Sequence, residues 1–219
     1  KPEMPAIGPK GPVIDPKPFL PPKPPERPAG VVIMIDPFDP PKRAFDNPND
    51  TATVPDLNGE TQLTLTGSLR ILKLGSLNGK SAIDASRLAV EEVVITGDLN
   101  GEAVVKLRSP NAKVTLGGYI GGNSRLTIEA PGGVVVLTPE SGRLTGSAVL
   151  TVTAKQIDAA GRLFGGCKLF ATLTKGGALK LAAVEEGAVV TYKKADPSDP
   201  APTVEKGIVK GGAKVIAGE

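Results

Sequence analysis

Leu57-Asn58-Gly59, Leu77-Asn78-Gly79 and Leu99-Asn100-Gly101 begin three consecutive segments of this chain, with glycines 20 and then 22 residues apart. Degenerate copies of the motif continue the series at Ile120-Gly121-Gly122, Leu144-Thr145-Gly146 and Phe164-Gly165-Gly166. A period of about 21 residues in β-type sequence is typical of a solenoid in which each repeat forms one coil.

Each repeat also carries an alternating apolar pair, four and six residues after its glycine. Such alternation is what a strand with one buried face requires. A second apolar run follows in most repeats, for example Ile71–Leu74, so each repeat contains at least two strands. The pairs are Leu63 and Leu65, Ile83 and Ala85, Val105 and Leu107, Leu126 and Ile128, Leu150 and Val152, and finally Phe170 and Thr172, or Leu169 and Ala171 if the sixth repeat is counted from Gly165.

A single coil cannot bury its own apolar face, so the repeats must stack on one another. We therefore predict an all-β fold: a right-handed parallel β-helix of about six or seven coils over residues 51–194. A Pro-rich extended arm over residues 1–50, with a short strand at 31–35, precedes it, and a Pro linker with a terminal hairpin over residues 195–219 follows. The alternative is an antiparallel β-sandwich or barrel, because strands at intervals of about 10 residues and Asn-Gly turns suit both folds.

The outward positions of the main strand predict the candidate functional face. It is rich in threonine and carries four charged residues at its middle, Asp84, Lys106, Arg108 and Glu129. Thr172 and Thr174 continue the threonine row if the sixth coil contains one extra residue. A ladder of salt bridges on a solvated face explains the charged residues without any chemistry.

In its period and alternation, the segment 57–192 resembles the right-handed parallel β-helix superfamily, which includes polysaccharide lyases, adhesins and phage tailspikes. The resemblance to the lyases implies that Lys106 or Arg108 would abstract a proton next to a uronate carboxylate, with Asp84 and Glu129 nearby. Calcium, which such lyases use, needs about six to eight oxygen ligands, more than this cluster offers. The expected protein is therefore not an enzyme, and carbohydrate is the ligand of the alternative interpretation.

Two further resemblances concern the whole solenoid. The Thr-x-Thr rows resemble the ice-binding face of some β-solenoid antifreeze proteins, although charged residues interrupt them in successive coils. The layout is also similar in kind to that of the bactofilins, cytoskeletal polymers of β-helical coils with flanking tails, whose coils are shorter than 20 residues. That likeness implies end-to-end or side-to-side assembly.

Composition excludes several classes of function. The chain has no histidine, which removes the commonest general base and metal ligand, and no cofactor or metal is expected. A net charge of only +3, without basic clusters, argues against nucleic acid. The lone Cys167 allows no internal disulfide and is expected to be buried. No apolar run approaches the length of a transmembrane helix, and we expect a secreted or cell-envelope protein.

The two ends of the chain carry the predicted interaction segments. Residues 1–30 contain eleven prolines and are expected to be extended polyproline-type chain. The strand that follows the arm, and the two strands of the terminal hairpin, could each cap the solenoid or pair with another subunit. We expect a structural protein that self-associates, or joins a larger assembly, through Val31, Val32, Ile33, Met34 and Ile35 at one end and Ile208, Val209, Val215 and Ile216 at the other.

Overall fold

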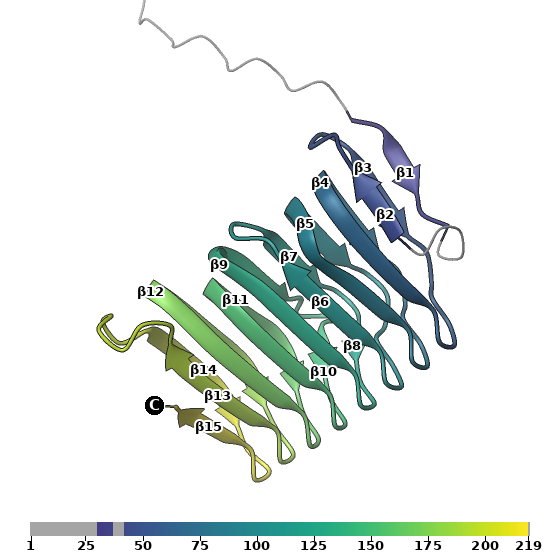
Figure 1. Cartoon of the computed structure of the whole chain (residues 1–219). Coiled ribbons are helices and arrows are strands. Elements are labelled where there is room, and N and C mark those ends of the chain that lie inside the picture. Colours follow the sequence, from purple (N-terminus) through teal and green to yellow (C-terminus); the bar gives the residue numbers. More distant parts are fainter. Residues whose placement is uncertain (1–29, 37–41, 219) are drawn as a thin grey trace, which may run out of the picture.

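The computed structural model describes residues 30–36 and 42–218, and it is a parallel β-solenoid of about nine turns without helices (Figure 1). The predicted fold class is confirmed. The number of coils exceeds the six or seven predicted, because segments assigned to the two tails form coils of their own. The rest of the predicted arm, residues 1–29 and 37–41, lies outside the described residues. No described segment forms a helix able to cross a bilayer.

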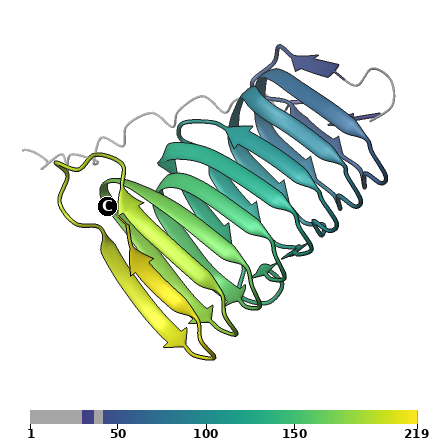
Figure 2. The same cartoon turned by 60° about the horizontal axis from the view of Figure 1, so that its bottom comes forward.

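The strands follow one another along a single axis, and Figure 2 shows the same stack from another side. Five strands of 13 or more residues bend around a corner and so serve two sides of their coil. The strands are β1 (Val32–Met34), β2 (Lys42–Phe45), β3 (Thr51–Val54), β4 (Gln62–Leu74), β5 (Ala82–Ile95), β6 (Val104–Arg108), β7 (Lys113–Leu116), β8 (Tyr119–Ile120), β9 (Arg125–Leu137), β10 (Arg143–Leu144), β11 (Val149–Leu163), β12 (Lys168–Val184), β13 (Val189–Lys194), β14 (Thr203–Val209) and β15 (Lys214–Ala217).

Parallel pairing between equivalent residues of neighbouring coils holds the stack together. Leu57 pairs with Leu77, Leu77 with Leu99, and Leu99 with Ile120, so the repeated motif forms one column. All strand pairs between described residues are parallel, which excludes the antiparallel sandwich or barrel. The alternating apolar residues face inward and form buried columns, one of which is Leu63, Ile83, Val105, Leu126, Leu150, Leu169 and Val190.

The repeat glycines turn the chain at one corner of every coil. Gly79 has a φ of 72°, and a Cβ added to it would lie 2.7 Å from the carbonyl oxygen of Gly59 in the preceding coil. A side chain is therefore excluded both by the backbone conformation and by the close stacking. The asparagines of the first two corners also contact each other, and Asn78 donates from Nδ2 to Oδ1 of Asn58 at 3.1 Å. Glu186, with a φ of 53°, is the one described non-glycine residue with a positive φ.

The C-terminal segment corrects the predicted hairpin. β14 pairs with β12 and β15 pairs with β13, both in parallel, so the two strands continue the solenoid rather than pairing with each other. Gly211 and Gly212 form a coil corner, with positive φ values of 65° and 77°. At the other end, β1 pairs in parallel with β3 and β2 with β4. The solenoid thus extends beyond residues 51–194 in both directions.

Candidate functional site

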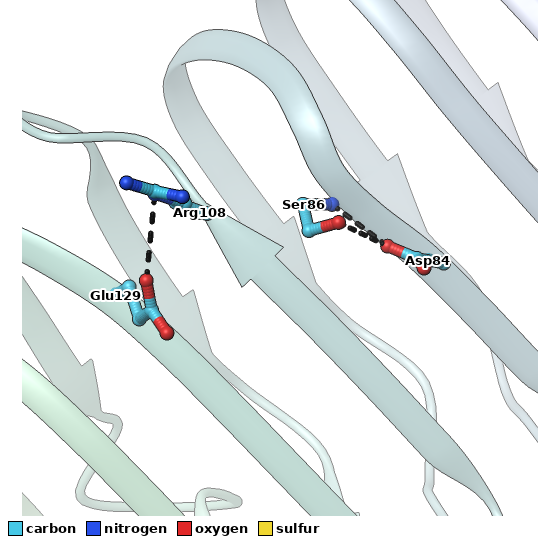
Figure 3. A network of polar contacts seen from close by, with 4 residues as sticks. All are labelled: Asp84, Ser86, Arg108 and Glu129. Carbon is cyan, nitrogen blue, oxygen red and sulfur yellow. Dashed lines mark hydrogen bonds and ion pairs between the residues drawn. The ribbon is translucent and has the colours of Figure 1, made fainter.

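The four charged residues predicted at the middle of the outer face lie on three neighbouring strands. Asp84 of β5 is in register with Lys106 of β6, and Arg108 of β6 is in register with Glu129 of β9. All point outward, as Figure 3 shows for three of them together with Ser86. The alternation of the strands therefore gathers them as predicted, on one side of the coil and across consecutive coils.

Their contacts are those of a solvated surface. Ser86 donates to Oδ1 of Asp84 from its N–H at 3.0 Å and from its hydroxyl at 2.6 Å, which together lower the pKa of Asp84 (Figure 3). Nε of Arg108 lies 3.5 Å from Oε2 of Glu129, and both side chains are more than half exposed. A surface ion pair of this kind contributes only about 0–1 kcal/mol. No described group of three or more acidic residues or cysteines is placed to hold a metal ion.

The threonine row is interrupted at the sixth coil. Thr151 is in register with Phe170, and Thr153 with Thr172, so no extra residue precedes this row in the sixth coil and Thr174 is not part of the row. Counting from Gly165 is therefore correct, and Leu169 and Ala171 are the buried pair. Thr174 instead donates from its hydroxyl to the carbonyl oxygen of Pro131. A 41% exposed phenylalanine replaces threonine in the face that resembles an ice-binding array.

A shallow groove, which was not predicted from the sequence, crosses four coils beside this face. Its volume is about 670 Å³. Small or apolar side chains leave room between Arg125 and Lys168, neither of which has a carboxylate within ion-pair distance in the described part of the chain. Its lining residues are Glu102, Val104, Asn123, Arg125, Ser147, Val149, Gly166 and Lys168.

Cys167 is fully buried, as predicted, in a column of small residues that face the interior. The main-chain N–H of Lys168 donates to the carbonyl oxygen of Ala148, and that of Val189 donates to the carbonyl oxygen of Cys167. The residue before each donor therefore lies over the acceptor, so that Ala148, Cys167 and Ala188 are stacked in consecutive coils. Burial raises the pKa of the Cys167 thiol to about 11. A protonated, inaccessible thiol is unsuited to nucleophilic or redox chemistry.

The predicted interaction residues lie at opposite ends of the solenoid. At the N-terminal end, Val31, Val32 and Met34 are each about two-thirds exposed, whereas Ile33 is half-buried and Ile35 is buried. The exposed residues at the C-terminal end are Ile208, Val209 and Ile216, and Val215 is half-buried. Both ends therefore leave apolar side chains uncovered by any described residue.

Each terminal coil also carries a cation at a position that is apolar in the coils further in. Arg43 of β2 is in register with the buried Leu65, and Lys206 of β14 with the buried Leu181. Inward-pointing charges in edge strands are a device that limits edge-to-edge association. Neither cation was predicted from the sequence, because their inward positions depend on the register of the terminal strands with the coils further in.

A buried carboxylate ties the last coil to the rest of the solenoid. The side chain of Glu185 is only 6% exposed, and its two oxygens contact Nη2 of Arg162 and Nζ of Lys210, the latter at 3.1 Å. The guanidinium of Arg162 also lies over the ring of Phe164, 5.2 Å from its centre. Since Lys210 belongs to the turn between β14 and β15, the cluster spans three consecutive coils.

This cluster predicts a pH dependence of stability. The hydrogen bonds from Arg162, and then Lys210, lower the pKa of Glu185 in the folded state below its ordinary value of 4.5. Its contribution is therefore fully present above pH 4.5 and is lost as the pH falls through the lower, folded-state pKa. We expect Glu185→Gln to lower the melting temperature near neutral pH, and this difference from wild type to shrink towards pH 3.

Thermal unfolding followed by circular dichroism between pH 3 and 8 measures this difference. Glu140→Gln, at an exposed carboxylate without a described ion pair, is the control and should change the melting temperature little at any pH. A constant difference between Glu185→Gln and wild type across the whole range would show that the carboxylate charge plays no part.

Comparison with known proteins gives no family for the chain. No protein-family model matches it, and neither the curated proteins nor the solved structures include a significant match.

Proposed function

We propose that this protein is a non-enzymatic structural module whose copies associate through the ends of the solenoid. The proposal rests on the unpaired strand edges of the two terminal coils. Among the described residues, β1 and β2 are paired on one side only, and so are β14 and β15. An unpaired strand edge presents a row of free N–H and C=O groups, which favours pairing with another chain.

The side chains at these ends support the same interpretation. Terminal repeats of a stable, isolated solenoid need a polar outer face that covers the core. Here the inward Val209 is 41% exposed, and the inward Ile33 and Val215 are only half-buried. A partner that stacked on either end would remove this apolar surface from water, at about 25 cal/mol per Å² buried.

The sides of the solenoid, by contrast, favour solubility. Charged side chains alternate along them, and several form ion pairs between coils, such as Lys80 with Glu60 and Lys113 with Glu92. Charged and mixed surfaces oppose sheet-to-sheet stacking. Association is therefore directed to the ends, as in a scaffold of the cell envelope or a secreted matrix.

Light scattering at increasing protein concentration tests the proposal. We expect the mass of the full chain to rise above the 22.4 kDa of a monomer. Deleting residues 1–36, which removes β1, should lower the mass at every concentration. Deleting residues 1–29 alone keeps β1 and separates docking by the Pro-rich arm from pairing of the strand edge. A full chain that remains monomeric throughout would refute the proposed function.

The groove between Arg125 and Lys168 favours a second candidate, a carbohydrate-binding surface protein. Its two cations, with Asn123 and Ser147 in the same lining, offer charge and hydrogen bonds to an acidic glycan. Titration with a polyuronate tests this function, with Arg125→Ala/Lys168→Ala as the site variant and Lys73→Ala/Lys180→Ala, on another face, as the control. Turnover abolished by Lys106→Ala or Arg108→Ala would indicate a lyase instead.

A further inference from the structure

We propose that the copies stack head to tail, with the N-terminal coil of one copy placed on the C-terminal coil of the next. This inference rests on the proposed function, and it adds the identity of the partner and the polarity of the assembly. It follows from where the strands of the two terminal coils lie on the cross-section of the solenoid.

The two ends carry strands at the same two places on this cross-section. Val32 of β1 begins a column of paired residues that runs through every coil to Thr203 of β14. Lys42 of β2 begins a second column that runs to Ile216 of β15. A second copy can therefore continue both columns, with β1 beside β14 and β2 beside β15, parallel and in the existing register.

The side chains of β1 and β14 are compatible with this arrangement. The inward residue Ile33 would lie over the half-buried Val204, so that the apolar interior passes from one copy to the next. Lys206 would lie over Ile35, and Asp36 follows directly in the chain. A lysine at such a place can bury its methylene stem and direct its ammonium towards a neighbouring carboxylate.

Contact between two C-terminal ends lacks this continuity. The strands would then run antiparallel, so the columns could not continue. The inward cations do not distinguish the two arrangements, because a head-to-tail contact also places two of them, Arg43 and Lys206, at one interface. A head-to-tail contact is heterologous and leaves one free end of each kind, so that growth continues into an open-ended filament unless the rotation closes a ring.

Proline substitutions that block one end at a time test the polarity. In edge strands, proline is tolerated where the replaced N–H points away from the sheet. The N–H of Ile35 donates to Thr53, so that of Met34, one residue earlier, points away from β3. At the other end, the N–H groups of Lys214 and Gly218 donate to the carbonyl oxygens of Ala188 and Tyr192. Because N–H groups alternate in direction along a strand, the N–H of Ala217 points away from β13. Met34→Pro blocks the N-terminal edge, and Ala217→Pro blocks the C-terminal edge.

The masses of the two blocked variants, alone and mixed in equal amounts, decide the outcome. We expect each variant alone to be a monomer, and the mixture to form a species of about twice the monomer mass. Met34→Thr and Ala217→Thr, which keep the N–H groups, are the controls and should associate like wild type. Circular dichroism checks that all four variants fold.

Dimers of either blocked variant alone would overturn the head-to-tail arrangement, because they require contact between two like ends. A mixture that stays monomeric while wild type associates would also overturn it. If wild type itself remains monomeric at the highest concentration reached, the proposed function fails, and the inference fails with it.

Discussion

Lys206→Leu is expected to strengthen self-association about tenfold or more. The substitution extends the buried column that ends at Leu181, and it removes the inward charge from the edge of β14, on which the next coil would stack. Burying a leucine side chain contributes about 1.5–3 kcal/mol, and each 1.4 kcal/mol is a factor of about ten in affinity. Sedimentation equilibrium of wild type and variant measures the change directly.

Lys180→Leu is the matched control for this experiment. Lys180 lies one coil further in, on β12, and points outward, in register with Asp158 and Glu205. The control replaces a lysine by the same apolar side chain outside the interior column and away from the terminal edge, so it should change the association constant little. An equal increase in both variants would show that added surface hydrophobicity alone causes association, and no increase in Lys206→Leu would show that this lysine does not limit stacking.

Leu99→Ala is expected to lower the free energy of unfolding by about 2–5 kcal/mol. Leu99 is fully buried, in the corner column between Leu77 and Ile120. The substitution leaves a cavity between stacked coils. Neighbouring side chains cannot move into this cavity without breaking the register between the coils. Chemical denaturation followed by circular dichroism gives the change.

Val204→Ala provides the comparison at the end of the stack. Val204 also faces inward, but it is only half-buried because no described coil covers it. Its truncation should cost well under half as much as that of Leu99 under conditions where the protein is monomeric. Equal losses at the two sites would mean that the last coil is as well packed as the central ones, which would contradict the open end.

The columns of the solenoid could be predicted from the sequence because corner and strand signals recur together. The Leu-Asn-Gly motif fixes the turn, and the alternating pair after it fixes which residues face inward, so that Leu63, Ile83 and Val105 are indeed stacked. The sixth coil was harder, since Gly165 and Gly166 both allow the turn. The register of Thr151 with Phe170, together with the φ of 72° at Gly165, shows that Gly165 is the corner residue.

The ends could not be predicted in the same way. A pair of glycines between two short apolar runs suits a hairpin as well as a coil corner, because both need residues with positive φ. Gly211-Gly212 therefore indicated a hairpin, and the pairing of β14 with β12 is what excludes it. The same ambiguity concealed the inward position of Lys206, which is defined only by its register with Leu181.

For the outer face, alternation predicted which charged residues point outward but not how they pair. The sequence placed Asp84, Lys106, Arg108 and Glu129 together, whereas the structure pairs Arg108 with Glu129 and leaves Asp84 with Ser86. The groove was not predictable, because it depends on small residues in one coil lying beside long ones in another. No single repeat contains that information.

The close stacking of the corner glycines makes each winding a unit that can be removed or duplicated. The amide nitrogen of Glu102 lies 2.7 Å from the carbonyl oxygen of Gly79, one coil earlier, so the chain could pass from Gly79 directly to Glu102. Excision of residues 80–101 would join every remaining column without altering its register. The number of windings is thus free to change by unequal recombination within the coding sequence, and a rod of a different length would need no new folding information.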